Sequence, residues 1–199
     1  MARPQSPDYD RRRDGIVGAA AELYAKRGFL GASVADLAKA CGTSKALIYH
    51  YFPSKDDILY EVMAAHLDDL VDAADDAMQS GDARDRLRAL TMAFMRLYVG
   101  ARHSHKVLLN ELDNLPPERR AEVVAKQRRI IAVVETLVRE IRPDANPVVL
   151  PLSMLFFGMI NWTHTWFRPG GDVSPEQLAS LAVDMALNGL GGLEPDQPG

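Results

Sequence analysis

The chain has 199 residues, of which 25% are charged and 47% are hydrophobic, the ordinary balance of a globular protein in water. Its one cysteine, Cys41, excludes an internal disulfide and is typical of a reducing cytoplasm. The longest apolar stretch, residues 148–160, is broken by Pro151 and Gly158 and is too short to cross a bilayer. Residues 1–7 lack the apolar run of a secretory signal, so we expect a cytoplasmic protein.

The net charge of −4 is unevenly distributed along the chain. Residues 1–55 hold nine basic and five acidic side chains, whereas the remainder holds 14 basic and 22 acidic ones. A basic N-terminal third on an acidic body favours local contact with a polyanion. Taken alone, the same pattern also fits an uneven surface charge without a partner.

Hydrophobic spacing predicts helices along almost the whole chain. The first covers residues 10–27 and ends at Gly28. Two short helices follow, over residues 34–41 and 44–51, and Gly42 between them allows a tight turn. Two helices joined in this way form a helix-turn-helix, which presents its second helix to the major groove of DNA.

The rest of the chain predicts longer helices. Ser54 caps a helix that reaches about Met78 and is expected to link two domains. Further helices are expected over residues 83–102, 105–115, 118–141, 148–167 and 175–188. The helix over residues 148–167 is apolar nearly all round, so we expect it to be buried or to lie at an interface. The prediction is an all-α protein of about nine helices: a three-helix DNA-binding domain over residues 1–55 and a helical bundle over residues 56–199.

The second helix of the helix-turn-helix carries the predicted base contacts. Leu47 and Ile48 are expected to face the core, and the first turn points outward. There Lys45 can donate to guanine and the Ala46 methyl can contact a thymine methyl. The predicted DNA-binding residues are Ser33, Thr43, Ser44, Lys45, Ala46, Tyr49, His50 and Lys55.

Several of these residues have a second interpretation. We expect Ser33, Tyr49, His50 and Lys55 to hold phosphates; alternatively, His50 and Lys55 are solvated and Tyr49 packs against the first helix. We favour such packing for Tyr51. The run Arg11, Arg12 and Arg13 is either an exposed helix start or an arm that reaches the phosphates of a flanking groove.

Residues 28–55 resemble the TetR family of bacterial transcriptional regulators. The resemblance rests on Gly28-Phe29, Ser33-Val34-Ala35-Asp36-Leu37-Ala38, Gly42-Thr43-Ser44, Leu47-Ile48-Tyr49-His50-Tyr51-Phe52 and Ser54-Lys55. Cys41 and Ala46 depart from the alanine and glycine that are frequent in the family. The resemblance implies a homodimer with an N-terminal DNA-binding domain and a C-terminal domain that holds a small ligand.

The run over residues 161–171 looks like the C-terminal region of TetR members that control fatty-acid, sterol or aromatic-acid degradation. Many of these respond to acyl-CoA thioesters. We predict that Phe94, Tyr98, Phe157 and Asn161 line the ligand pocket; the alternative is that this apolar stripe is core or dimer interface. Candidates for the CoA phosphates are Arg119, Arg120, Arg128, Arg129 and Arg168, which are otherwise solvated.

His103 and His105 form a His-x-His pair. Such a pair can bind a metal, but at a helix junction it more often caps the helix or is solvated. We therefore predict no metal site and no cofactor.

The sequence thus predicts a ligand-responsive repressor. It is expected to bind an operator as a homodimer formed through the last two helices, with the two DNA-reading helices about 34–36 Å apart. A small apolar effector, such as an acyl-CoA thioester, is expected to release it from DNA. The alternative is a regulator of efflux or stress genes that senses a free hydrophobic or aromatic compound. An enzyme is not expected, because the chain contains no phosphate loop, nucleophile elbow or His-Glu-x-x-His run. A DNA-binding protein without an effector is the remaining class.

Overall fold

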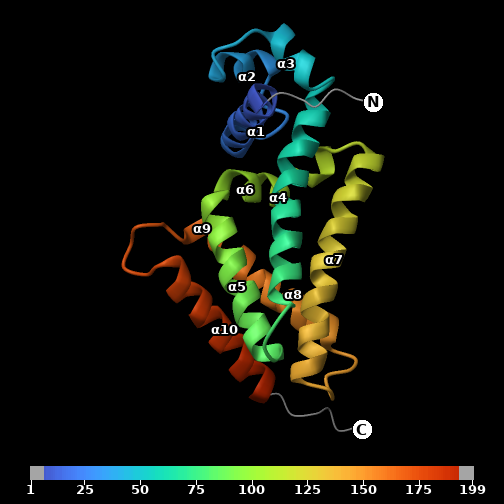
Figure 1. Ribbon diagram of the computed structural model, residues 1–199, viewed down its shortest axis with the longest axis vertical. Helices are drawn as coiled ribbons and strands as arrows, with labels where there is room; N and C mark the ends of the chain where they lie inside the picture. The colour runs from blue at the N-terminus through green and yellow to red at the C-terminus, as the bar shows by residue number, and fades with distance from the viewer. Residues whose placement is uncertain (1–6, 193–199) are drawn as a thin grey trace. The chain divides into compact units, whose positions relative to one another are not determined.

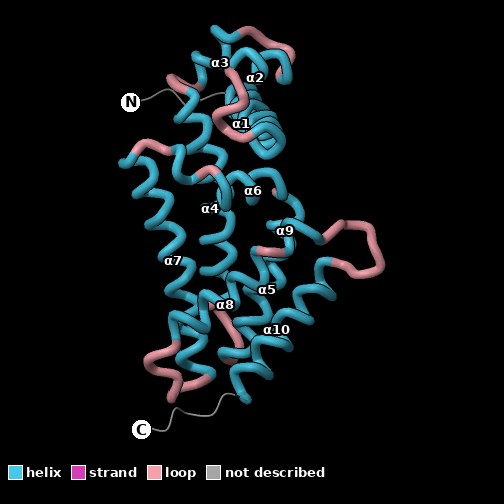
Figure 2. The backbone as a smooth tube through the Cα atoms, turned by 180° about the vertical axis from the view of Figure 1, so that it is seen from behind, coloured by secondary structure: helices cyan, strands magenta, loops and turns pink. Residues whose placement is uncertain are grey.

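The computed structural model describes residues 7–192, and within that range every regular element is helical (Figures 1 and 2). The prediction of an all-α protein is confirmed. The elements are α1 (Pro7–Arg27), α2 (Val34–Ala40), α3 (Lys45–Tyr51), α4 (Lys55–Ala77), α5 (Ala83–Gly100), α6 (Arg102–Asn110), a 3-10 turn η1 (Leu112–Asn114), α7 (Pro117–Ile141), α8 (Val149–Asn161), α9 (Thr163–Trp166) and α10 (Pro175–Gly192).

One expected helix, over residues 148–167, is divided into α8 and the single turn α9. Side chains at the division compete for the backbone. The Thr163 hydroxyl donates to the Ile160 carbonyl at 2.6 Å, and the Thr165 hydroxyl donates to the Trp162 carbonyl at 2.8 Å. Hydroxyl groups that bond to the preceding turn weaken and often bend a helix, so these two bonds favour the division, although a single bond of this kind leaves α5 and α7 continuous.

The chain folds into two compact units. Unit 1 comprises residues 1–67 and 103–124, and unit 2 comprises residues 68–102 and 125–199, so α4 and α7 each contribute to both. The sequence prediction places a functional boundary after residue 55, and that boundary stays a prediction. No helix among the described residues has the length and hydropathy needed to cross a membrane.

The core of unit 1 holds the helix-turn-helix in place. Each helix contributes apolar side chains that are nearly inaccessible to water: Ala20 and Tyr24 from α1, Leu37 from α2, Ile48 from α3, and Ile58 and Leu59 from α4. Burying one such side chain contributes about 1.5–3 kcal/mol. The position of α3 is therefore fixed by its buried side, and its other side is exposed.

A polar cluster in unit 1 joins the start of α4 to the start of α7. The Tyr60 hydroxyl donates to Glu122 at 2.5 Å, and this bond, with burial, raises the pKa of Tyr60 to about 12. The Arg119 guanidinium lies 4.3 Å from the centre of the Tyr60 ring and 3.4 Å from the Asp57 carboxylate. Together these contacts hold the turns of α4 that directly follow α3.

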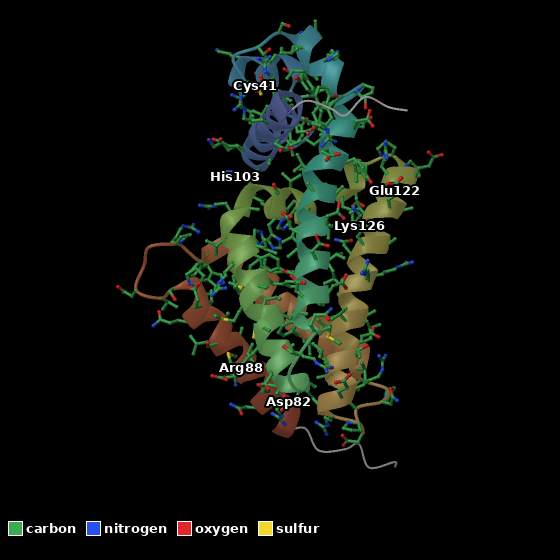
Figure 3. All side chains as sticks on the ribbon, viewed as in Figure 1. Cys41, Asp82, Arg88, His103, Glu122 and Lys126 are labelled. Carbon is green, nitrogen blue, oxygen red and sulfur yellow. The ribbon has the colours of Figure 1, made fainter. Side chains whose placement is uncertain are left out.

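Unit 2 is a helical bundle in which α10 lies along α5 (Figure 1). Leu87, Leu90 and Phe94 of α5 are buried. Two ion pairs flank this packing: Arg88 with Asp184 at 3.0 Å and Arg96 with Glu176 at 3.2 Å. In the same unit Lys126 of α7 donates to Asp68 of α4 at 2.6 Å (Figure 3).

Apolar side chains in unit 2 are also exposed, mostly on α8, α9 and α10. This exposed apolar set comprises Leu150, Met154, Leu155, Trp162, Trp166, Leu181 and Met185. The predicted apolar helix over residues 148–167 is therefore half buried, with its other side open to solvent in the single chain.

Candidate DNA-reading surface and effector pocket

The turn between α2 and α3 is built by capping residues. Ser33 and Asp36 form a capping box at the start of α2, and the bonds from Ser33 lower the pKa of the Asp36 carboxyl. Gly42 has a φ of 61°, which lets the amide of Thr43 reach the Ala38 carbonyl at 2.9 Å and close the helix end. The Ser44 hydroxyl then accepts the amide of Leu47 and starts α3.

Helix α3 has one buried and one open side. Ile48 is fully buried and Leu47 half-buried, in line with the predicted inward face. Lys45, Ala46 and His50 are exposed, and Tyr49 keeps 48% of its surface accessible. Ser33 and Ser44 are exposed and Thr43 is half-buried. The structure thus brings the predicted base-reading side chains onto one accessible surface; their contacts with DNA stay predictions.

An aromatic cluster supports the end of α3. The Tyr51 ring lies 4.6 Å from the Tyr9 ring of α1, centre to centre, which confirms the predicted packing of Tyr51 against the first helix. The His50 ring lies 5.4 Å from Tyr51 and 6.3 Å from Tyr9, both edge to face. His50 therefore has an aromatic support on one side while remaining exposed on the other.

Basic residues near α3 have partners inside unit 1. The Lys55 ammonium donates to the Phe29 carbonyl at 2.5 Å and lies 4.0 Å from the centre of the Phe29 ring, and burial lowers the pKa of Lys55. One of its three N–H donors is occupied, and its contact with phosphate stays a prediction. Arg11 pairs with Asp8 on the exposed start of α1, and Arg13 pairs with Glu61 and lies over the Phe52 ring.

Lys106 is a structural residue of unit 1 that sequence reasoning missed. Its ammonium, on α6, donates to the Ala25 carbonyl at 2.7 Å. Carbonyls in the last turn of a helix have no partner within the helix and carry its partial negative charge. Lys106 therefore holds the end of α1 from a position 81 residues along the chain, a contact that local pattern cannot reveal.

Replacing Lys106 by methionine should lower the free energy of unfolding by about 1–3 kcal/mol, because the substitution keeps the aliphatic stem and removes the charged donor. Urea unfolding followed by circular dichroism measures the change. The matched control is Lys26→Met, which removes an exposed ammonium paired with Glu22 four residues earlier and should cost about 0.5 kcal/mol or less. Equal effects of the two substitutions would contradict a special role for Lys106.

Cys41 lies at the end of α2 in the helix-turn-helix (Figure 3). It lines a surface hollow with Arg12, Ile16, Leu47 and Tyr51. The thiol is half-buried, and burial raises its pKa. Because the thiolate is the reactive form, this environment disfavours thiol chemistry.

The two histidines of the His-x-His pair do not act together. The interpretation of His105 as a capping or solvated residue is wrong: its side chain is 1% exposed, because it packs against His66 of α4. The His66 Nε2 and His105 Nδ1 atoms lie 3.2 Å apart, and burial lowers the pKa of His66 to about 4. Within the described part of the chain, three or more potential ligands nowhere gather for a metal.

The four predicted pocket residues all lie in unit 2. Phe94, Tyr98 and Phe157 are buried, and the Phe94 and Tyr98 rings are 5.9 Å apart. Tyr98 also lines a cavity of about 20 Å³ with Arg102, His164 and Phe167 among others. Asn161 is half-buried, and its buried Oδ1 atom has no hydrogen-bond partner among the described residues. Ligand contacts of these residues stay predictions.

A larger apolar pocket of about 280 Å³ lies elsewhere in unit 2. It is formed by α5, α7, α8 and α10. The lining residues are Leu87, Val134, Val138, Leu152, Leu155, Phe156, Met159, Met185, Ala186 and Gly189. None of the four predicted residues is among them. Sequence reasoning placed apolar residues on these helices but could not tell which ones border an open space.

Most of the candidate arginines have acidic or carbonyl partners. Arg119 pairs with Asp57, Arg120 with Asp113, and Arg129 with Asp75. Arg168 donates to the carbonyls of Thr165 and Phe167. A phosphate at Arg119, Arg120 or Arg129 would share the guanidinium with a carboxylate.

Comparisons with known proteins agree with this architecture. Residues 16–62 match the family model "Bacterial regulatory proteins, tetR family", and residues 80–190 match "Tetracyclin repressor-like, C-terminal domain". The chain is 28% identical over 188 residues to the HTH-type transcriptional repressor KstR2 of Rhodococcus jostii, covering 90% of this chain and 91% of that protein.

Two solved structures show the same fold. A TetR-family transcriptional regulator from Bordetella parapertussis has a TM-score of 0.85 and 38% identity, over 92% of this chain and 97% of that one. AibR, solved with isovaleryl coenzyme A and operator DNA, has a TM-score of 0.78 and 27% identity, over 87% and 97% of the two chains. Proteins of this kind are DNA-binding regulators rather than enzymes. The chain therefore belongs to the TetR family of transcriptional regulators.

Proposed function

We propose that the protein is a ligand-responsive repressor that binds operator DNA as a homodimer. The observation that carries the proposal is the exposed row of Lys45, Ala46, Tyr49 and His50 on α3, above a fully buried Ile48. The exposed side chains of such a helix can contact bases while its buried side stays packed in the core. The relative KstR2 is a repressor, which supports the same direction of control here.

In this proposal the first turn of α3 reads bases and the surrounding residues hold the backbone. Lys45 donates to guanine, and the Ala46 methyl contacts a thymine methyl. Tyr49 and His50 hold phosphates, as do the hydroxyls of Thr43 and Ser44, the free amides at the helix start capped by Ser33 and the remaining donors of Lys55. Residues 1–55 form the DNA-binding domain, and residues 56–199 form the effector and dimer domain.

The dimer is proposed to form through α8 and α10. The exposed apolar set lies on these helices and on α9, and large exposed apolar surfaces usually mark an interface. A second copy of the chain would cover them. The two reading helices of such a dimer need to lie about 34–36 Å apart to enter successive major grooves.

An acyl-CoA thioester is the proposed effector class. Support comes from AibR, which was solved with isovaleryl coenzyme A, and from the buried apolar rings of Phe94 and Phe157, which suit an acyl group. The proposed lining residues remain Phe94, Tyr98, Phe157 and Asn161. The orphan Oδ1 of Asn161 offers an acceptor to a polar part of the effector.

A free hydrophobic or aromatic compound is the second candidate. Two observations favour it. The described side chains that line the larger pocket are all apolar, and Arg119, Arg120 and Arg129 already have carboxylate partners. Effectors of this class need no phosphate site.

Operator release tests the proposal. Duplexes selected from random DNA by the purified protein provide an operator, and fluorescence anisotropy at fixed salt measures its affinity. We expect isovaleryl-CoA, lauroyl-CoA or phenylacetyl-CoA to weaken operator binding about 5–150-fold, the range of a coupling energy of about 1–3 kcal/mol. CoA alone and the free acids are the controls and should have little effect.

Three other outcomes would distinguish the two effector classes or contradict parts of the proposal. Release by free aromatic compounds but by none of the thioesters would favour the second candidate. No response to either class would contradict the effector part of the proposal, while selective DNA binding would still stand. Failure to enrich any duplex would contradict the repressor itself.

A further inference from the structure

The apolar pocket of unit 2 has a composition that points to one class of ligand. Its floor consists of Leu87, Val134, Val138 and Phe156, which are buried. Among the residues that the structure describes, none of the lining side chains carries a charge or a hydrogen-bonding group. A charged or strongly polar group would lose its hydration there without compensation, whereas a hydrocarbon would gain.

The volume of the pocket limits the size of the ligand. Its volume of about 280 Å³ is roughly twice that of an engineered apolar cavity of about 150 Å³ that takes up benzene. It is therefore suited to about eight to ten carbon atoms, as in a fused pair of aromatic rings or a medium alkyl chain.

Gly189 accounts for part of this space. It lies inside α10, where glycine costs about 1 kcal/mol relative to alanine. A Cβ atom built at this position meets no heavy atom of the described residues within 4 Å, so packing against them does not require the missing side chain. Ala186, one turn earlier, is the other small residue of the lining. The small residues leave open a space that larger ones would fill.

The rim of the pocket consists of exposed apolar side chains. Leu155 is 70% exposed and Met185 is 67% exposed, and both belong to the exposed apolar set of α8–α10. A ligand in the pocket would cover part of their surface. The unbranched thioether chain of Met185 can adapt to ligands of different shape.

We propose that this pocket binds an uncharged hydrocarbon group of about eight to ten carbon atoms, and that the bound group lies against the dimer partner. The second part rests on the proposed homodimer, because the rim residues lie on the surface assigned to it. Ligand and partner then cover one another's apolar surface, so binding of the ligand strengthens the dimer by linkage.

Direct binding of naphthalene tests the first part without DNA. The full chain is titrated with naphthalene, and binding is followed by the emission of naphthalene and by the midpoint of thermal unfolding. We expect saturable binding with one molecule per chain. Octanoate, which is charged, should bind at least about tenfold more weakly, a difference of about 1.4 kcal/mol.

Filling the pocket should abolish this binding. We expect Gly189→Leu to weaken naphthalene binding at least about tenfold without lowering the unfolding midpoint, because leucine is the better helix former. Gly100→Leu is the matched control, since Gly100 lies in α5, is absent from the lining, and is also free of steric neighbours. Ala186→Leu fills the same space from one turn away and replaces Gly189→Leu if that variant does not fold.

Sedimentation equilibrium tests the second part. Naphthalene should tighten the dimer of the unmodified chain and leave that of Gly189→Leu unchanged. The hydrocarbon site is overturned if naphthalene does not bind, if octanoate binds as tightly, or if both filled variants bind naphthalene as the unmodified chain does. An unchanged dimer constant in saturating naphthalene overturns the shared site. None of these measurements uses an operator, so their failure is distinguishable from failure of the repressor proposal.

Discussion

Replacing Lys45 by alanine should weaken operator binding by about 1–3 kcal/mol for each half-site, and thus by about 2–6 kcal/mol for a dimer on a two-fold operator. Lys45 is exposed in the first turn of α3, where no contact within the protein would compensate for the loss of a base contact. The substitution should leave the fold unchanged, because alanine is a good helix former. Fluorescence anisotropy with a selected operator at fixed salt measures the loss.

The way in which the loss of affinity depends on the operator sequence shows whether a residue contacts a base or a phosphate. A base contact by Lys45 predicts relaxed preference at one base pair of the half-site, whereas Tyr49→Ala should weaken binding almost equally on all sequences. Lys26→Ala is the control, because it removes a positive charge from α1 and leaves α3 intact. Unchanged affinity in both α3 variants would contradict the assignment of the reading surface.

Acid should destabilise the protein between pH 6.5 and about pH 4 through His66. The folded protein keeps this histidine neutral by burial, with a pKa of about 4, whereas the unfolded chain takes up the proton near pH 6.5. The unfolded state thus binds more protons in this window, and the free energy of unfolding falls as the pH falls through it. Above pH 6.5 His66 is neutral in both states, so it makes the stability independent of pH. Below pH 4 the free energy of unfolding is lower by about 3 kcal/mol because of His66.

Urea unfolding at several pH values between 7 and 4 checks this expectation. His66→Gln should reduce the pH dependence, although glutamine beside His105 also costs stability at neutral pH. His103→Gln, a change of the same chemistry at a half-exposed position of α6, should retain the full dependence. An identical slope in unmodified protein and His66→Gln would show that acid acts through other groups.

The helices were predictable wherever their ends carry local chemistry. Ser33, Gly42, Ser44 and Ser54 stop or start helices through contacts within a few residues, so the residue types along the chain are enough to find these ends. The division between α8 and α9 was not predictable in this way. Hydroxyls bond back to carbonyls at this point, but such bonds also occur inside the uninterrupted helices α5 and α7.

The exposed side of α3 was easier to predict than the apolar pocket for the same reason. The periodicity of α3 separates Ile48 from Lys45 and Tyr49 within one helix, so local spacing is enough. Pairs such as His66 with His105, or Lys106 with Ala25, join residues 39 and 81 positions apart. The apolar pocket combines four helices between Leu87 and Gly189, and hydrophobicity alone does not distinguish a side chain that borders a void from one that fills it.

The environment of Cys41 has a consequence for how the regulator behaves under oxidative stress. Because burial raises the pKa of this thiol, little of it is ionised at neutral pH, and peroxide oxidises the ionised form. With one cysteine in the chain, no resolving thiol is available to trap a sulfenic acid within the same molecule. Direct oxidation of Cys41 by peroxide is therefore disfavoured, and a disulfide could form only with a thiol of another molecule.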